Sequence, residues 1–370
     1  MIDIESNPIF NGTGGEGAVY ASRSRPGQLF KKYRPGKMTP EVEEKLKYMI
    51  DHPIKVGDEN SKFAWPTEVG YENGQPVGFY MPRLPCDEKI YFAYDYTDDM
   101  SEVRNYKNRV IVARNLCTMI HWANINNFVI GDFNDKNIGL DKVSGYVSMF
   151  DCDSFHLLGG KHRCGACMPG YAAPELLRAM RADGSTNYLG ANLPTFTAET
   201  DLFALAIHVF RLLMNGAHPY NGIDVTMDSS SAIAGVGDQP VHDGLYCFAL
   251  GKKPKNRTIP PLLILPDIFS EYFDRAFIHF EAGRPTWRQW LNALDNYRMH
   301  LVMCGKNPMH WHHKGLSCCP WCEADERESK KNRGLFKPKF KVRRIDQESF
   351  KRELYLDPVD LNLAGSYASR

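Results

Sequence analysis

Four side chains in the first half of the chain have types and spacings suited to a site that handles phosphate groups. Lys31 follows a glycine-rich stretch, Asp132 and Asn137 stand five residues apart, and Asp151 comes 14 residues after Asn137. Transfer of the terminal phosphate of ATP needs positioning and charge neutralisation more than covalent chemistry. A glycine flap, a lysine, and carboxylate and amide ligands for magnesium supply both. Each motif is common alone, but their order predicts phosphoryl transfer.

The glycine-rich stretch runs from Gly12 to Tyr20. Glycines there would let backbone N–H groups approach phosphate oxygens, whereas larger side chains would hinder that approach. A glycine-rich hairpin without a ligand is the alternative for this stretch taken by itself. We predict nucleotide contacts from these members of the stretch: Gly12, Gly14, Gly15, Gly17 and Val19.

The segment from Ile130 to Asn137 carries the predicted catalytic groups. Asp132 would accept a proton from the attacking hydroxyl or orient it, and Asn137 would hold one magnesium ion. The apolar run before Asp151 reads as a strand that delivers this aspartate as the second metal ligand. Asp153, two residues later, is a competing candidate. Turn-capping aspartates and asparagines explain each position singly, but they explain the set poorly.

Three later motifs extend the pattern: Ala173-Pro174-Glu175, Asp201 within an apolar run, and Arg284. With them, the chain from about residue 8 to residue 300 resembles the protein-kinase family. In particular it is similar to divergent bacterial kinases that accompany a von Willebrand A-type protein and a PP2C-type phosphatase in tellurite-resistance-like operons. The resemblance implies an α+β, two-lobed fold with a strand-rich first lobe and a helical second lobe.

The resemblance gives Lys31 the role of the lysine that grips the inner phosphates. Its neighbour Lys32 would point to the other face of the strand, and two apolar residues precede Lys31, so we favour Lys31. The partner of this lysine is expected on the next helix, at Glu41 or Glu44. We choose Glu44.

The resemblance also assigns a hinge that meets adenine through backbone groups, at Met81 to Leu84. Because Pro82 has no N–H, the donor to adenine is expected to be Leu84.

Structural roles follow for three residues of the helical lobe. Asp201 matches the buried helix aspartate that anchors the catalytic loop. Glu175 and Arg284 match a bidentate ion pair that orders the lobe. Small-molecule kinases of this fold usually lack such an Ala-Pro-Glu segment, so these matches favour a protein substrate.

The chain departs from the kinase pattern in ways that bear on regulation and rate. Gly131 stands where many kinases have an arginine that pairs with a phosphate, and residues 155–170 contain no Ser, Thr or Tyr. We therefore predict that phosphorylation of this segment does not switch the protein. Asn134 replaces a usual lysine and Met168 falls near a usual threonine, which puts rate and acceptor class in doubt; Lys136 is a partial substitute for the missing charge.

Cysteines and histidines gather near the C-terminal end. Cys304, His310, Cys319 and Cys322 have the composition of a zinc site, closed by a Cys-x-x-Cys pair. A structural site is expected, because no spare acid or base lies nearby in sequence. The resemblance favours His310 and Cys319 as ligands, and ordinary thiols are the alternative. The neighbouring candidate ligands are His312, His313 and Cys318.

Two further segments each allow a functional and a purely structural interpretation. Cys164 and Cys167 would suit a redox switch or a metal clip, but ordinary loop cysteines are the favoured interpretation. Residues 327–344 carry nine basic side chains against one acid. A solvated tail is the default, and docking to a partner or to nucleic acid is the alternative.

The pattern of apolar residues predicts the elements that position these groups. Residues 8–85 read mainly as strands, including 19–21, 29–30 and 76–81. A helix should begin at Thr39, which can cap it, with Pro40 in its first turn. From about residue 101, spacings of three and four indicate helices. The clearest series are Val110, Ala113, Leu116, Cys117 and Ile120, and Phe203, Leu205, Ile207, Phe210 and Leu213.

The composition is that of an ordinary globular protein, with 43% apolar and 24% charged residues. The 45 basic residues nearly cancel the 44 acidic ones, so overall charge gives no reason to expect nucleic-acid or membrane binding. The first residues are acidic rather than basic, and no apolar run approaches a membrane span, which predicts a cytoplasmic protein. Ten cysteines in a reducing compartment argue against a disulfide framework.

We divide the chain into a first lobe (1–85), a second lobe (86–300), a zinc module (301–327) and a basic tail (328–370). The predicted function is a Ser/Thr protein kinase that uses ATP with Mg²⁺ or Mn²⁺ and carries structural Zn²⁺. The candidate substrate is a von Willebrand A-type protein and the candidate antagonist is a PP2C-type phosphatase. The alternative is a nucleotide-binding pseudokinase scaffold that uses the zinc module and the tail for assembly.

Overall fold

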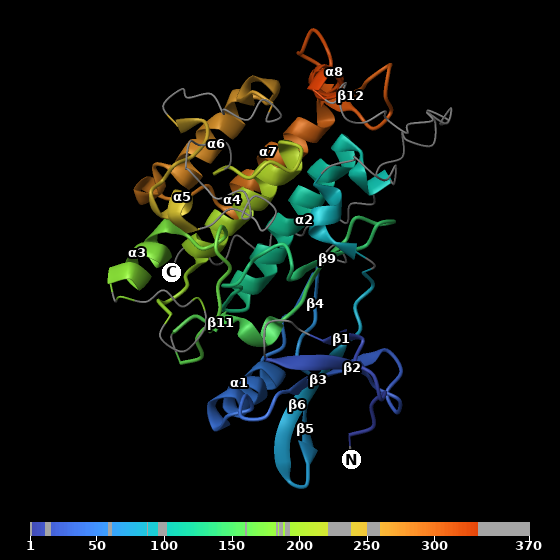
Figure 1. The fold of residues 1–370 in the computed structure, drawn as a ribbon, viewed down its shortest axis with the longest axis vertical. Helices are drawn as coiled ribbons and strands as arrows, with labels where there is room; N and C mark the ends of the chain where they lie inside the picture. The colour runs from blue at the N-terminus through green and yellow to red at the C-terminus, as the bar shows by residue number, and fades with distance from the viewer. Residues whose placement is uncertain are drawn as a thin grey trace.

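The computed structural model describes residues 2–11, 16–57, 61–86, 88–94, 102–159, 161–182, 184, 188, 193–220, 238–249 and 260–331. Within these residues, one end of the molecule is built from strands with a single long helix, and the other end is mainly helical (Figure 1). The chain is therefore a mixed α/β protein in which a sheet-rich part is followed by a helical part.

The sheet-rich part is built on a five-stranded antiparallel sheet. Its strands, in spatial order, are β1 (Phe10–Asn11), β2 (Gly17–Ala21), β3 (Gln28–Tyr33), β6 (Gln75–Pro82) and β5 (Glu68–Glu72). The three segments predicted as strands, 19–21, 29–30 and 76–81, all lie in this sheet. In the β2–β3 pair Val19 stands opposite Lys31, so the glycine-rich stretch leads directly to the lysine strand.

Helix α1 (Pro40–Asp51) begins where the sequence predicts. Thr39 accepts a hydrogen bond from the Val42 N–H at 3.4 Å, and Pro40 occupies the first turn, where its missing N–H costs nothing. Leu46 and Met49 are buried and hold the helix against the core. Glu41 and Glu44 remain on the exposed side.

A second sheet has the order β4 (Ser61–Phe63), β10 (Val147–Met149), β9 (Ile138–Leu140) and β7 (Glu88–Lys89). Strand β9 begins directly after Asn137, and β10 ends two residues before Asp151. The two strands are antiparallel, and the Phe150 N–H donates to the Asn137 carbonyl at 2.8 Å. This pairing brings Asn137 and Asp151 together.

A short antiparallel pair links the segments on either side of the site. Strand β8 (Phe128–Val129) pairs with β11 (His156–Leu157). The chain that leaves Asp151 is therefore held beside the chain that leads to Asp132.

Helix α2 (Tyr106–Ile125) runs through the helical part, and nearly all its residues are buried. Helices α4 (Ala198–Leu213) and α7 (Trp287–Met299) and strand β4 pack against it, so the predicted apolar series marks only one of its buried faces. Among the described residues, no helix is both long and apolar enough to cross a membrane. The remaining helical segments of this part are α3 (Pro174–Ala182), α5 (Asp238–His242), α6 (Asp267–Phe277), η1 (Ile90–Ala93), η2 (Glu102–Arg104), η3 (Cys152–Ser154), η5 (Leu262–Ile264) and η6 (Phe280–Ala282).

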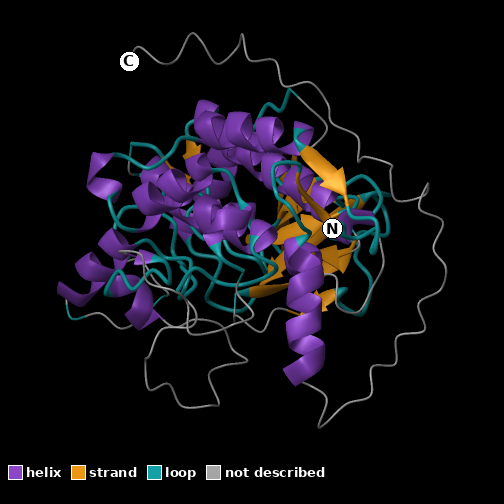
Figure 2. Ribbon diagram, turned by 90° about the horizontal axis from the view of Figure 1, so that it is seen from above, coloured by secondary structure: helices purple, strands orange, loops and turns teal. Residues whose placement is uncertain are grey.

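The C-terminal described segment forms a hairpin, β12 (Leu301–Met303) and β13 (Trp311–His313), followed by α8 (Pro320–Lys331). Seen from above, α8 projects away from the other helices (Figure 2). Its first turn packs inward: the buried Trp321 lies against Tyr106 of α2, with ring centres 4.6 Å apart and the rings tilted, and donates to the Trp311 carbonyl at 2.7 Å. The module therefore rests on the start of α2. The predicted basic tail begins within α8, at residue 328, and its part beyond Lys331 lies outside the described residues.

Candidate functional site

The loop after β8 is held by Asp201 of α4. The backbone N–H groups of Ile130 and Gly131 donate to the two carboxylate oxygens of Asp201, at 2.7 and 2.9 Å. Burial raises the pKa of Asp201 to about 7, while these two hydrogen bonds act in the opposite direction. The loop that carries Asp132 is thus anchored to a buried helix at its first two residues.

Asp132 and Asn137 lie side by side in this loop. The Asn137 amide nitrogen donates to the Asp132 carbonyl at 3.1 Å and to Asp132 Oδ2 at 3.2 Å. Burial raises the pKa of Asp132, and the nearby charge of Asp151 adds to that shift. Asp132 Oδ1 is buried and has no hydrogen-bond partner among the residues that the structure describes.

Asn134 stabilises the same loop from within. Its side-chain oxygen accepts from the Lys136 N–H at 2.9 Å, and its amide nitrogen donates to the Asp132 carbonyl at 3.3 Å. An asparagine at this position therefore shapes the turn between Asp132 and Asn137.

Asp151 stands at the mouth of the site. It has a φ of 50°, a left-handed conformation that aspartate tolerates better than most residues. Its carboxylate is 49% exposed and lies 3.4 Å from Lys31 Nζ. An exposed carboxylate beside a buried lysine is a suitable ligand for a metal ion that also binds phosphate.

Lys31 is buried and surrounded by acids. Its Nζ lies 2.7 Å from Asp153 Oδ2, and 3.4 Å from both Asp151 and Glu16. The Tyr33 hydroxyl donates to the same Asp153 oxygen at 2.6 Å. Burial alone would lower the pKa of Lys31, but the charges of Asp153 and Asp151 outweigh it and raise the pKa well above its usual value. Lys31 is therefore held in its charged form.

The expected partner of Lys31 on α1 requires correction. Glu44 is exposed and pairs with Lys161, and Lys31 pairs with Asp153 instead. The reason is the rotation of α1, which places Glu44 on its outer face. The α1 residue whose charge interacts with Asp153 is Lys45.

The glycine-rich stretch and the hinge are described in part. Gly12, Gly14 and Gly15 lie outside the described residues. A Cβ on Gly17 would lie 2.4 Å from the Lys32 carbonyl oxygen, so packing between β2 and β3 by itself requires glycine there. The remaining predicted nucleotide contacts, Val19, Met81 and Leu84, lie in or directly after the five-stranded sheet.

Gly131 packs directly against the side chain of Cys164. Gly131 has a φ of 78°, and a Cβ there would lie 2.8 Å from Cys164 Sγ, so no arginine fits this position. Burial raises the pKa of Cys164 to about 12, and its thiol donates to the Ala166 carbonyl at 3.2 Å. Cys167 is likewise buried and forms no disulfide. These features suit ordinary packing cysteines.

Glu175 and Arg284 form a bidentate pair in the helical part. Arg284 donates to the two Glu175 oxygens at 2.6 and 2.8 Å. It also donates to the carbonyls of Glu199 and Ala276, at 3.0 and 3.3 Å. One buried guanidinium therefore joins α3, α4 and α6.

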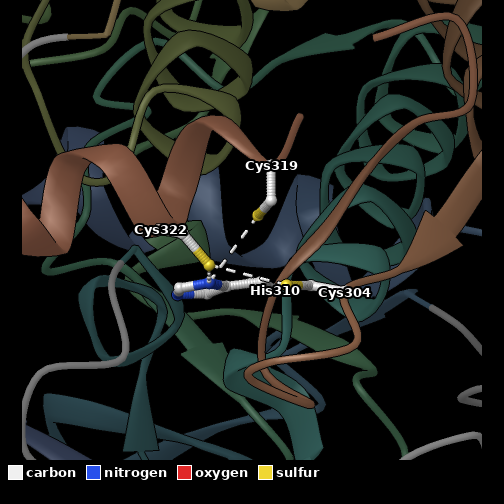
Figure 3. A group of neighbouring side chains, drawn as sticks. All are labelled: Cys304, His310, Cys319 and Cys322. Carbon is white, nitrogen blue, oxygen red and sulfur yellow. Dashed lines mark hydrogen bonds between the residues drawn. The ribbon is translucent and has the colours of Figure 1, made fainter. Parts of the chain in front are cut away.

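A second group of side chains converges at the C-terminal module (Figure 3). The ligand atoms of Cys304, His310, Cys319 and Cys322 all lie within 4.8 Å of one another. His310 Nδ1 is 3.5 Å from Cys322 Sγ and 3.8 Å from Cys319 Sγ, and the Cys304 and Cys322 sulfurs are 3.5 Å apart. A tetrahedral zinc ion with bonds of about 2.0–2.3 Å needs ligand atoms about 3.3–3.8 Å apart. Three thiols and one imidazole at these distances fit zinc.

The surroundings of His310 settle which ring nitrogen faces the sulfurs. Its Nε2 lies 3.2 Å from Asn307 Nδ2 and 3.3 Å from an Asp325 carboxylate oxygen, which leaves Nδ1 towards the cysteines. Such outer partners fix the orientation of a ligating histidine. The group does not include the alternative candidate ligands His312, His313 and Cys318.

The sequence does not predict the roles of three residues of the site. The sequence indicates Asp153 only as a competing metal ligand, and it gives no indication of the contacts of Tyr33 or Lys45. The sequence signal for the contact of Asp153 is the second acid in Asp151-Cys152-Asp153, two residues after the proposed metal ligand.

Comparisons with known proteins bear on this geometry. No protein-family model matches the chain. The chain is 29% identical over 337 residues to Protein kinase YegI of Escherichia coli K12, and the match covers 85% of this chain and 48% of that protein. The same protein of Escherichia coli O157:H7 matches with the same identity and coverage. The chain spans about half the length of these curated relatives. This similarity supports a kinase-like protein, and so does the proximity of Lys31 to Asp151 and of Asp132 to Asn137.

Proposed function

We propose that the protein is an ATP-dependent protein kinase that phosphorylates Ser or Thr hydroxyls of a partner protein. One observation carries the proposal: Lys31 of β3, the loop with Asp132 and Asn137, and Asp151 after β10 come together, because the β9–β10 pairing brings Asn137 beside Asp151. Asn137 lies 3.2 Å from Asp132, and Lys31 lies 3.4 Å from Asp151. Positioning and charge neutralisation by such a group is what phosphoryl transfer requires.

Each member of this group has a distinct proposed role. Lys31 binds the inner phosphates, and Asp151 and Asn137 hold Mg²⁺ or Mn²⁺. The amide nitrogen of Asn137 is engaged with Asp132, which leaves its oxygen for a metal ion. Asp132 accepts or orients the attacking hydroxyl, and its Oδ1 has no hydrogen-bond partner among the described residues. A bound metal ion would neutralise charge that develops on the transferred phosphate.

The substrate class is argued from the helical part. The bidentate contact between Glu175 and Arg284 supports an ordered Ala173-Pro174-Glu175 segment, which favours a protein substrate over a metabolite. Within this proposal, a von Willebrand A-type protein is the candidate substrate and a PP2C-type phosphatase is the candidate antagonist. The Cys304–Cys322 cluster would bind one structural zinc ion and fix the C-terminal module on α2.

The test is incubation of the protein with radiolabelled ATP, Mg²⁺ and purified candidate partners, followed by mass spectrometry of the modified residues. Labelled Ser or Thr on a partner supports the proposal. As a control, Asp51→Asn changes an exposed carboxylate at the last residue of α1, and this variant should label the partner equally well. Label confined to Tyr, or to a small molecule, would contradict the substrate class.

The second candidate function is a pseudokinase scaffold, which the replacement at Asn134 favours. It predicts magnesium-dependent ATP binding without any transfer to protein. Calorimetric titration and the transfer assay, run on the same preparation, separate the two functions.

A further inference from the structure

The environment of Lys31 contains one dominant partner. Asp153 Oδ2 lies 2.7 Å from Lys31 Nζ, and the side chains of both residues are only 6% exposed. Asp151 and Glu16 are farther away, at 3.4 Å, and each is about half exposed. Because charge pairs strengthen as water is excluded, the buried contact with Asp153 dominates the position of the lysine.

The acids of α1 are engaged elsewhere. Glu43 lies 2.7 Å from Lys47 and accepts from the Tyr71 hydroxyl at 2.8 Å. Glu44 pairs with Lys161 on the exposed side. Glu41 is exposed at the start of the helix. None of these three carboxylates contacts Lys31 in the structure.

Helix α1 instead places a cation, Lys45, on the side of η3, against which the helix packs. Lys45 Nζ donates to the Arg163 carbonyl at 3.3 Å. Burial lowers the pKa of Lys45, and the negative charge of Asp153 acts in the opposite direction. Asp153 Oδ1 is buried without a hydrogen-bond partner among the described residues. Asp153 is therefore the buried anion that pairs with Lys31, and the charge of Lys45 acts on it without a direct contact.

We propose that Asp153 is the positioning residue for Lys31, in place of a glutamate on α1. The inference rests on the proposed function and names a residue that the proposed mechanism does not use. Tyr33 supports it, because its hydroxyl bonds to the same oxygen and fixes the aspartate side chain.

The arrangement has a mechanical consequence. Asp153 lies in η3, the short helical turn that begins directly after Asp151, whereas Lys31 lies on β3. The lysine is therefore joined to the same short turn that carries the proposed metal ligand. A change in the conformation of this turn would move both the phosphate-binding lysine and the metal ligand, whereas the carboxylates of α1 contribute nothing to the pair.

The test uses a photoreactive ATP analogue that labels side chains at a nucleotide site, with labelled residues identified by mass spectrometry, because photolabelling does not depend on the protonation state of the lysine. Asp153→Asn keeps the size of the side chain and removes its charge. We expect labelling of Lys31 to slow and the Kd for ATP to rise, each by about tenfold or more. Glu44→Gln is the matched control and should change neither by more than about twofold.

A rescue variant separates positioning from general stability. Lys45→Glu combined with Asp153→Asn moves the carboxylate from η3 to α1, the helix that packs against η3. We expect this double variant to recover a substantial part of the Lys31 labelling that Asp153→Asn loses. A purely structural role for Asp153 predicts no recovery, because the double variant also changes a second partly buried residue.

Two results would overturn the inference: unchanged ATP affinity and labelling in Asp153→Asn, or loss of both in Glu44→Gln. If Asp153→Asn does not fold, Asp153→Glu provides the test. This variant keeps the negative charge, so Lys31 should still be labelled. A folded Asp153→Glu variant in which Lys31 is no longer labelled would refute the inference. These readouts do not require phosphate transfer. A wild-type protein that transfers no phosphate, yet loses Lys31 labelling in Asp153→Asn, would refute the kinase proposal and leave this inference standing.

Discussion

The ion pair between Glu175 and Arg284 allows a quantitative test of how the helical part is held together. Arg284 is 1% exposed at its side chain and donates to both Glu175 oxygens. Glu175→Gln keeps the shape of the side chain but removes the charge and one of the two acceptors. Breaking one member of a buried pair generally costs about 3–5 kcal/mol, because a charge remains buried without its partner.

Two features reduce that cost here. The Glu175 side chain is 36% exposed, and Arg284 keeps its hydrogen bonds to the carbonyls of Glu199 and Ala276. We therefore expect Glu175→Gln to lower the free energy of unfolding by about 2–3 kcal/mol. Urea denaturation followed by circular dichroism measures this loss, provided that the slope with denaturant is unchanged.

A matched control tests the reasoning. Glu271 forms an exposed pair with Arg275 one helical turn away, at 3.7 Å, and its side chain is 60% exposed. Glu271→Gln removes the same kind of charge from the same kind of partner, yet it should cost less than about 0.5 kcal/mol. Equal losses in the two variants would show that burial of the pair does not govern its contribution, and the argument would fail.

Three further predictions concern metal, pH and regulation. Elemental analysis of freshly purified protein should find one zinc per chain, and Cys322→Ser should lower both the zinc content and the thermal stability; a stable protein without zinc would mean that these cysteines are ordinary thiols. Burial lowers the pKa of His121 to about 4, so the unfolded chain binds a proton that the folded protein does not. Its contribution to stability should be complete above about pH 6.5 and decline towards pH 4, by up to about 1.4 kcal/mol per pH unit. His121→Phe should remove this slope in urea titrations near pH 7 and pH 5, and an unchanged slope would contradict the burial argument. Phosphatase treatment should leave the transfer rate nearly unchanged, because residues 155–170 contain no hydroxyl side chain and Lys161 is already paired with Glu44; a reversible loss of rate mapped to that segment would refute this.

Much of the local structure could be predicted because the signals were local. The start of α1 followed from Thr39 and Pro40, whose capping and backbone preferences act within one turn. The convergence of Cys304, His310, Cys319 and Cys322 followed from ligand chemistry, and the structure adds which neighbouring candidates are excluded. Such features depend on a few adjacent residues.

The partner of Lys31 could not be predicted in the same way. Successive residues of a helix differ by about 100° in direction, so an error of one position in the residue that faces the site exchanges Glu44 for Lys45. The contact between Asp153 and Lys31 spans 122 residues, and no local preference encodes it. The burial of α2 on nearly all sides also depends on α4, α7 and β4 packing around it, which its own periodicity does not reveal.

The most direct test of the central claim is the rate of phosphate transfer by Asp132→Asn, measured beside its affinity for ATP and Mg²⁺. Asp132 faces Asn137 and is placed to address the acceptor hydroxyl, so the variant should lose transfer by at least about a hundredfold and retain nucleotide affinity within a few-fold. Wild-type protein and Asp132→Asn with equal rates of transfer, or no transfer by either despite tight binding of ATP, would contradict the account.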